Sequence, residues 1–323
     1  MTKAFRIHET GGPEVLRWED VDPGTPGEGQ ILVRHTAVGV NFIDTYHRSG
    51  LYPLELPSGI GMEGAGVVEA VGPGVASLKP GDRVAYASGL GSYAEARLMP
   101  ADRVVPIPDG IEDRQAAAMM LKGMTVEYLI RRTYPVQAGE TVLFHAAAGG
   151  VGLIFCQWAK HLGATVIGTA GSKEKAEMAR AHGCDHTILY NDEDFPARVR
   201  ELTGGKGVPV VYDGVGKSTF AGSLDCLRPR GMMVSFGNAS GAVPPFNLGA
   251  LSQKGSLYIT RPTLMTYTAT HDDLLESANA LFDVVKSGAV TLEINQTYPL
   301  AEAEQAHRDL EARKTTGSTV LLP

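Results

Sequence analysis

A glycine-rich stretch in the middle of the chain has the residue types that hold phosphate. Residues 144–172, FHAAAGGVGLIFCQWAKHLGATVIGTAGS, predict a strand, a glycine turn, a helix and a second strand. Ala147, Gly149 and Gly152 occupy the small positions of a G-x-G-x-x-G pattern, with alanine in the first. Glycine at 149 lets the backbone approach a pyrophosphate, glycine at 152 lets the helix pack on the strand, and the first helical amides face the phosphates. The pattern predicts a dinucleotide site, with a tight strand–helix turn that binds nothing as the alternative. Its candidate contacts are Ala147, Gly149, Gly150, Val151 and Gly152.

The end of the second strand predicts which dinucleotide is bound. An NAD site places a carboxylate there, about 20 residues after the glycines, to accept the ribose 2′-hydroxyl. This chain instead has small residues ending in Gly171 and Ser172, with Lys173 and Lys175 just after. Backbone amides, a hydroxyl and an ammonium suit a phosphate dianion, which a carboxylate would repel. The sequence therefore predicts NADPH, with a solvated helix start as the alternative because Glu174 and Glu177 give this helix ordinary surface charge as well.

Length and charge restrict the class of protein. The 323 residues fit two domains better than one. Lys plus Arg number 29 and Asp plus Glu number 36, so the net charge is −7, and broad binding to nucleic acid or to an anionic membrane is not expected. No stretch approaches the roughly 20 apolar residues of a membrane helix, and the first residues show no signal peptide. Three widely spaced cysteines without a CxxC pair favour a reducing cytoplasm over a disulfide framework.

The order of the predicted elements indicates an α/β protein. About the first 120 residues contain short Val-rich runs bounded by glycine, which predict strands. From about Gly123, apolar strands alternate with helices, which predicts a doubly wound parallel sheet. The last 60 residues predict two helices and a terminal strand. We expect that strand to return to the sheet of the first domain.

Several segments in a fixed order resemble one family over nearly the whole chain. They are GGPEVL at 11–16, GVNFIDTYHRSGLYP at 39–53, KGMTVEYLIRRTYPV at 122–136, AAAGGVGL at 146–153, SFGNASG at 235–241 and ITRPTL at 259–264. They are similar to the zinc-free quinone oxidoreductases, or zeta-crystallin-like proteins, of the medium-chain dehydrogenase/reductase superfamily. The resemblance implies a GroES-like β-rich catalytic domain over 1–122 and 264–323, a doubly wound Rossmann NADP-binding domain over 123–263, and an active site in the cleft between them.

The resemblance also argues against a catalytic zinc ion. Zinc enzymes of the superfamily have a Cys ligand in the segment matching GVNFIDT and a His ligand in the one matching GMEGAG. Asn41 and Met62 stand there in this chain, and they are not a zinc-ligand pair. Without a Lewis acid, alcohol oxidation is disfavoured. Hydride delivery to an electron-poor acceptor, a quinone or an enone, is the remaining chemistry.

The resemblance assigns four residues of the first domain to the nicotinamide and the substrate. Asn41 would offer an amide donor, or only stabilise a turn. Asp44 would orient its neighbours, or only cap a short helix. Tyr46 and Tyr52 would stack on a flat ring or donate a hydroxyl, or only pack in a loop.

Further cofactor contacts are expected from the second domain and the chain end. Thr125 would lie near the nicotinamide amide, or only begin a helix. Phe236, Gly237 and Asn238 follow an apolar strand, where α/β sheets place ligands, although a Gly-Asn turn is the alternative. Tyr190 would contact the adenosine or pack, and Arg261 would bind a substrate oxygen or a phosphate. Arg313 would reach the nicotinamide-side phosphate, and either arginine is alternatively a surface ion pair.

These residues together predict an NADPH-dependent quinone oxidoreductase that uses no zinc. An enoyl or alkenal reductase with the same cofactor is the first alternative, and a non-catalytic RNA-binding or structural protein is the second. The segment GSLYITRP, residues 255–262, resembles the family's edge strand that pairs subunits, which implies a homodimer.

Overall fold

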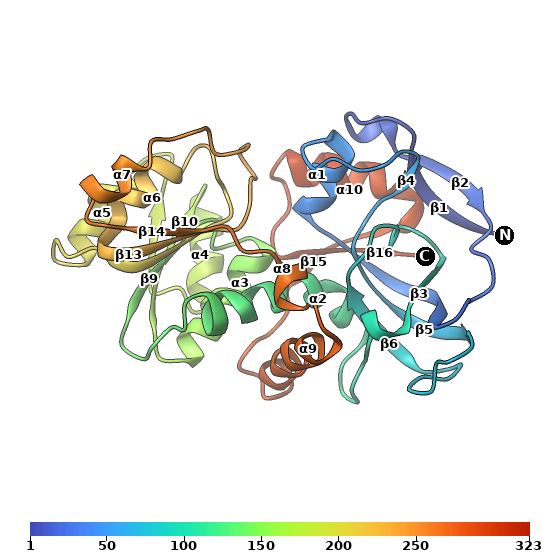
Figure 1. The fold of residues 1–323 in the computed structure, drawn as a ribbon. Helices are drawn as coiled ribbons and strands as arrows, with labels where there is room; N and C mark the ends of the chain where they lie inside the picture. Colours follow the sequence, from blue (N-terminus) through green and yellow to red (C-terminus); the bar gives the residue numbers. More distant parts are fainter. The chain divides into compact units, whose positions relative to one another are not determined.

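The computed structural model describes all 323 residues, which form two compact units (Figure 1). Unit 1 comprises Met1–Met124, Thr268–Lys286 and Leu292–Pro323, and unit 2 comprises Thr125–Tyr267 and Ser287–Thr291. These limits differ by a few residues from the domain boundaries expected at 122/123 and 263/264. Residues 287–291 belong to unit 2, whereas they were expected in the GroES-like catalytic domain. The domain boundaries themselves remain predictions.

The main sheet of unit 1 is built around its longest strand, β3 (Gln30–Val40). Ile31, Val33 and Ala37 are fully buried in β3, at the period of two expected when one face of a strand covers a core. β16 (Ser318–Leu322) pairs antiparallel with β3, so the prediction that the terminal strand returns to the first domain's sheet is confirmed. The strand order is β15-β16-β3-β5-β6-β8, with β7 also paired to β3. The other strands are β5 (Glu63–Val71), β6 (Arg83–Ala87), β7 (Ala96–Pro100), β8 (Val105–Pro106) and β15 (Ile294–Pro299).

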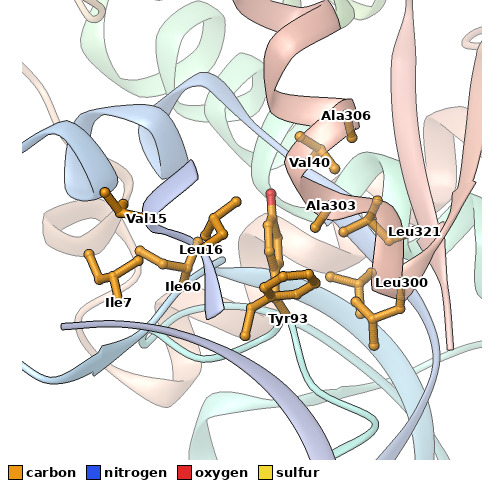
Figure 2. Packing of buried hydrophobic residues seen from close by; sticks show 12 residues of the cluster. Ile7, Val15, Leu16, Val40, Ile60, Tyr93, Leu300, Ala303, Ala306 and Leu321 are labelled. Carbon is orange, nitrogen blue, oxygen red and sulfur yellow. The ribbon is translucent and has the colours of Figure 1, made fainter. Parts of the chain in front are cut away.

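A second, three-stranded sheet in unit 1 has the order β2-β1-β4. Its strands are β1 (Thr2–Ile7), β2 (Arg17–Val21) and β4 (Ser58–Gly59). A buried cluster joins this sheet to β3, β16 and the helix α10 (Ala303–Glu311), with the ring of Tyr93 in its middle (Figure 2). Residues from both ends of the chain therefore share one core.

Unit 2 contains a six-stranded parallel sheet with the order β11-β10-β9-β12-β13-β14. Numbered along the chain, this is the 3-2-1-4-5-6 order of a doubly wound dinucleotide-binding fold, so the predicted fold class is confirmed. The direction of winding reverses between β9 and β12, which is where such folds bind their ligand. The strands are β9 (Thr141–Phe144), β10 (Thr165–Ala170), β11 (His186–Leu189), β12 (Val208–Asp213), β13 (Leu227–Ser235) and β14 (Tyr258–Thr260).

Neighbouring residues of the two central strands of unit 2, β9 and β12, pack on opposite layers of helices. Leu143 and Val211 belong to a cluster that includes residues of α5 (Phe195–Leu202) and α6 (Phe220–Cys226). The next residues along these two strands, Phe144 and Tyr212, pack instead on Phe155 of α3 (Gly150–His161), with ring centroids 4.3 Å and 4.8 Å from it. Burial on both faces explains why these strands are continuous apolar runs.

The remaining helical segments complete both units. They are η1 (Pro13–Val15), α1 (Phe42–Ser49), η2 (Ala101–Arg103), α2 (Asp113–Tyr128), η3 (Leu129–Thr133), α3 (Gly150–His161), α4 (Lys173–Ala181), α5 (Phe195–Leu202), α6 (Phe220–Cys226), α7 (Gly249–Gln253), α8 (Leu264–Tyr267), α9 (His271–Lys286) and η4 (Leu300–Glu302). None of the helices is long and apolar enough to cross a membrane.

Candidate functional site

The glycine loop connects β9 to the start of α3. Gly149 precedes the helix in extended conformation, with φ −78° and ψ 167°, and offers no side chain to cap it. The first amides of an α-helix have no acceptor within the helix, so those of Gly150, Val151 and Gly152 are available to a ligand. A helix start of this kind is a ready site for an anion such as a pyrophosphate.

Two glycines of this loop have different surroundings. A Cβ atom at Gly152 would lie 2.5 Å from the Ala147 carbonyl oxygen and 2.6 Å from that of Ala146. A Cβ atom at Gly149 would meet only the Ala146 oxygen, at 3.3 Å. Gly152 is therefore required by the packing of the loop itself, whereas the space over Gly149 is open to a bound group. The arrangement fits a dinucleotide phosphate.

The end of β10 carries the residues predicted to select the 2′-phosphate. Gly171 packs against Tyr190, since a Cβ atom at 171 would lie 2.6 Å from the Tyr190 hydroxyl oxygen. The Ser172 hydroxyl caps α4 and accepts a hydrogen bond of 3.3 Å from the Lys175 amide. The pKa of Glu174 is lowered by a backbone amide and by the Ser172 hydroxyl. Ser172 thus caps the helix, and its contact with a 2′-phosphate is still a prediction.

The carboxyl end of β13 holds four further predicted contacts together. Phe236 packs on Phe144, with ring centroids 5.7 Å apart. Gly237 lies against the end of β12, because a Cβ atom there would be 2.4 Å from the Gly214 carbonyl oxygen. Arg261 donates from Nη1 to the Ser235 carbonyl oxygen over 2.8 Å, which places its guanidinium at the same strand end. The Asn238 carbonyl oxygen accepts from the Gly241 amide. Apart from Thr125 in α2 and Tyr190 just after β11, the dinucleotide candidates of unit 2 therefore lie at the carboxyl ends of β9, β10 and β13.

The predicted substrate-side residues of unit 1 lie in or next to α1. Asn41 is buried just before the helix and donates from Nδ2 to Glu63 Oε2 over 2.8 Å. Glu63 is fully buried and also accepts from the Lys122 ammonium, at 3.2 Å, and from the Leu121 amide, at 2.8 Å. A buried carboxylate with three donors is well satisfied. Glu63 therefore fixes the orientation of the Asn41 amide, a role that the sequence did not indicate.

Asp44 is completely buried within a chain of polar side chains. One of its carboxylate oxygens, Oδ2, accepts from the backbone amide of Asn41 and from the Tyr93 hydroxyl, each at 2.9 Å. The other oxygen, Oδ1, has no hydrogen-bond partner. Tyr93 is in turn 3.0 Å from His307 Nε2, and Arg48 Nη1 donates to His307 Nδ1 over 2.9 Å. Burial raises the pKa of Asp44 to about 7, against these hydrogen bonds and the charge of Lys122. Burial and Arg48 lower the pKa of His307 to about 3, so its ring is neutral.

Four more predicted residues are placed as follows. Tyr46 is buried and its ring meets that of Tyr52 edge-on, at 5.2 Å between centroids. Thr125 is buried in α2. Arg313 is exposed just after α10 and adopts a left-handed backbone with φ 59°, a conformation that favours glycine. The contact between Tyr46 and Tyr52 fits the alternative in which these side chains only pack in a loop. Their contact with a substrate is still a prediction.

The donor set at the zinc position does not fit a zinc ion. The side chains there are Asn41, Met62 and Glu63, and Glu63 is already bound to Lys122. Zinc in proteins is bound by three or four thiolate, imidazole or carboxylate ligands, and neither an Asn amide nor a Met thioether supplies one. No group of three or more His, Cys, Asp or Glu side chains in the structure is arranged to hold a metal ion.

Two family models match the chain, one within unit 1 and the other mostly within unit 2. Residues 27–109 match the family described as the alcohol dehydrogenase GroES-like domain, and residues 150–278 match the one described as zinc-binding dehydrogenase. This pair of domains defines the medium-chain dehydrogenase/reductase superfamily.

Individual relatives are similar over their whole length. A quinone oxidoreductase of Pseudomonas aeruginosa is 58% identical, with 100% of both chains covered. A 2-haloacrylate reductase of a Burkholderia species is 50% identical, over 100% of this chain and 99% of the relative. The crystal structure of an Escherichia coli quinone oxidoreductase complexed with NADPH has a TM-score of 0.98 at 52% identity, covering 99% of this chain and 100% of the other. The chain belongs to the quinone oxidoreductase family of that superfamily.

Proposed function

We propose that this protein reduces a quinone with NADPH and uses no zinc. The observation that carries the proposal is the loop from Ala147 to Gly152, where open helix amides follow the central strand and Gly152 has no room for a side chain. The strand end at Gly171 and Ser172, which has no carboxylate, supports NADPH over NADH. Relatives named quinone oxidoreductase, one of them complexed with NADPH, support both the acceptor and the cofactor.

The residues of the chain would bind and orient, while the hydride chemistry belongs to the cofactor. Bound NADPH supplies a hydride to an electron-poor acceptor. The amides of Gly150 to Gly152 would hold the pyrophosphate, and Ser172 with Lys175 would hold the 2′-phosphate. Tyr190 would lie by the adenosine, and Thr125, Phe236, Gly237, Asn238 and Arg313 would lie along the nicotinamide half.

Five residues would act on the substrate side. The Asn41 amide, fixed by Glu63, would polarise or orient the acceptor oxygen. Tyr46 and Tyr52 would border its ring, Asp44 would hold α1 and Asn41 in place, and Arg261 would contact an oxygen. We propose that water supplies the proton that follows the hydride.

A second candidate function is reduction of an activated C=C bond. The relative named a 2-haloacrylate reductase supports it, because an acrylate carries a C=C bond conjugated to a carboxyl group. The same hydride donor and the same loop would serve both reactions, so the acceptor distinguishes them.

The test is NADPH and NADH oxidation by metal-stripped protein. 1,4-Benzoquinone, 9,10-phenanthrenequinone, an alkenal, a 2-haloacrylate, and an alcohol with NADP⁺ would be compared in parallel. Quinone turnover that prefers NADPH is expected. Turnover of only the alkenal or haloacrylate would replace the quinone function by C=C reduction. Tight NADPH binding without any oxidation would refute both.

Lys175→Glu is expected to weaken NADPH binding by about tenfold or more, because a carboxylate would replace an ammonium beside the 2′-phosphate. NADH, which lacks that phosphate, should bind as before or better. Fluorescence titration of both cofactors measures this. Glu177→Lys on the exposed face of the same helix is the control and should change neither affinity. Unchanged NADPH affinity in Lys175→Glu would show that the 2′-phosphate site lies elsewhere.

We further propose that the protein is a homodimer in a reducing, cytoplasmic location. β14 is the last strand of its sheet, so its outer backbone groups have no neighbouring strand. Tyr258 in β14 is 59% exposed and Leu248 is 70% exposed, which is apolar surface suited to a second copy. All three cysteines are buried and free, which is compatible with a reducing compartment.

Tyr258→Lys is expected to raise the dimer dissociation constant by about tenfold or more, since a two-fold interface through β14 would bring two ammonium groups together. Sedimentation equilibrium measures the constant, and NADPH affinity should not change. Lys254→Ala, at an exposed position before β14, is the control: it also changes the net charge by one and should leave the dimer dissociation constant unchanged. A Tyr258→Lys protein that dimerises like the wild type would exclude β14 as the interface.

A further inference from the structure

A buried polar cluster lies directly beneath the glycine loop, at the carboxyl ends of the two central strands. His145 follows β9, Thr169 is in β10, Asp213 ends β12, and Ser223 is in α6. None of these four side chains is more than 1% exposed. β9 and β12 are the strands between which the winding of the sheet reverses. The sequence singled out none of the four.

The hydrogen bonds of this cluster can be assigned in only one direction. Asp213 accepts from the amides of Val215 and Gly216, at 2.8 and 2.9 Å, and from the Thr219 hydroxyl, at 2.7 Å. The Ser223 hydroxyl also donates to Asp213, over 2.9 Å. A carboxylate accepts and does not donate, so the Ser223 proton is committed to it. The Ser223 oxygen, 2.9 Å from His145 Nε2, must then accept from that nitrogen.

This assignment fixes the His145 ring and the Thr169 hydroxyl. Burial lowers the pKa of His145, so its ring is neutral. With its proton on Nε2, Nδ1 can only accept. The Thr169 hydroxyl, 3.0 Å away, donates to it. The Thr169 oxygen is then left to accept from the Ala146 amide, at 3.2 Å.

The chain of hydrogen bonds ends on the one loop residue that has an unfavourable backbone. Ala146 has φ 59°, which costs about 1 kcal/mol or more for a residue with a Cβ atom. Its carbonyl oxygen accepts from the Gly149 amide over 3.0 Å, and the Thr169 carbonyl oxygen accepts from the Ala147 amide over 2.9 Å. Thr169 therefore holds two successive amides, one through its side chain and one through its backbone.

We propose that the chain Asp213–Ser223–His145–Thr169 is a clamp that holds Ala146 in its left-handed conformation and so keeps the glycine loop shaped for the dinucleotide. Thr169 and His145 are positioning residues in this scheme: the Thr169 hydroxyl binds the Ala146 amide of the loop, and His145 acts through Thr169. The inference rests on the proposed NADPH binding for its effect on affinity. The shape of the loop can be measured without any cofactor.

The test removes the Thr169 hydroxyl at constant shape. Thr169→Val is expected to raise the Kd for NADPH by about tenfold, because it leaves the Ala146 amide and His145 Nδ1 without partners. It should also speed hydrogen exchange at the Ala146 amide in the protein without cofactor. Thr169→Ser keeps the hydroxyl and should behave like the wild type. Thr187→Val, in the adjacent strand β11, is the matched control, since the Thr187 hydroxyl is buried without a hydrogen-bond partner.

Ala146→Gly separates a clamp from general loosening. Glycine adopts positive φ without steric cost. The double variant Ala146→Gly, Thr169→Val should therefore have a Kd for NADPH within about threefold of the wild-type value. Equal affinity and equal exchange in Thr169→Val and the wild type would overturn the clamp, as would failure of Ala146→Gly to restore binding. If the wild type itself does not bind NADPH, the proposed function fails. Faster exchange of Ala146 in Thr169→Val would then still support the clamp, and unchanged exchange would refute it.

Discussion

Replacing Gly152 with alanine is expected to raise the Kd for NADPH by roughly a hundredfold or more. The added Cβ atom would lie 2.5 Å from the Ala147 oxygen and 2.6 Å from the Ala146 oxygen, and both are backbone atoms that cannot rotate away. The loop must therefore move, and the amides that would bind the pyrophosphate move with it. The same crowding should lower the free energy of unfolding by about 1–3 kcal/mol. Cofactor titration and urea denaturation measure the two effects.

Gly149→Ala is the matched control, because it adds the same methyl group to the same loop. Its Cβ atom would meet only the Ala146 oxygen, at 3.3 Å, and the backbone at Gly149 has negative φ. The free energy of unfolding should change by less than about 1 kcal/mol. NADPH binding should still weaken, since the methyl group enters the space in front of the helix start. If Gly152→Ala binds NADPH as well as the wild type does, this loop is not the phosphate site.

The sequence predicted most of unit 2 because its organisation depends on local patterns. The apolar runs ending at Phe144 and Ala170, with the helix between them, follow from periodicity and from glycine spacing. The strand order follows from the rules for parallel sheets with helical crossovers. The return of β16 to β3 was also predicted, although its partner strand lies far away in the chain.

The polar chain around Asp44 could not be predicted in the same way. Tyr93, Arg48 and His307 have no spacing in common, and Arg48 and His307 are 259 residues apart in sequence. Only the folded core of unit 1 brings the Tyr93 hydroxyl within hydrogen-bonding distance of both Asp44 in α1 and His307 in α10. Glu63 was missed for the same reason, since its partner Lys122 lies 59 residues further along. Buried polar pairs of this kind are defined by tertiary structure and not by residue type.

Asp44 is expected to make the protein less stable as the pH rises from about 4 to about 7. Burial raises its pKa from 3.8 to about 7 in the folded state, so the folded protein holds a proton that the unfolded chain releases. Between these two values the folded state binds more protons, and the free energy of unfolding therefore falls with rising pH. The decrease from this group is complete above pH 7. A pKa difference of about three corresponds to a loss on the order of 4 kcal/mol.

Asp44→Asn should remove this contribution, because an amide cannot ionise. The difference in free energy of unfolding between Asp44→Asn and the wild type should therefore shift in favour of the variant as the pH rises through the same interval. An amide nitrogen at the unpartnered Oδ1 position adds a cost that does not depend on pH. Urea denaturation at a series of pH values gives both curves. Asp192→Asn, at an exposed position, is the control and should run parallel to the wild type. Parallel curves for Asp44→Asn and the wild type would mean that Asp44 is ionised throughout. The hydrogen bonds from Asn41 and Tyr93, with the charge of Lys122, would then stabilise the Asp44 charge more than burial opposes it.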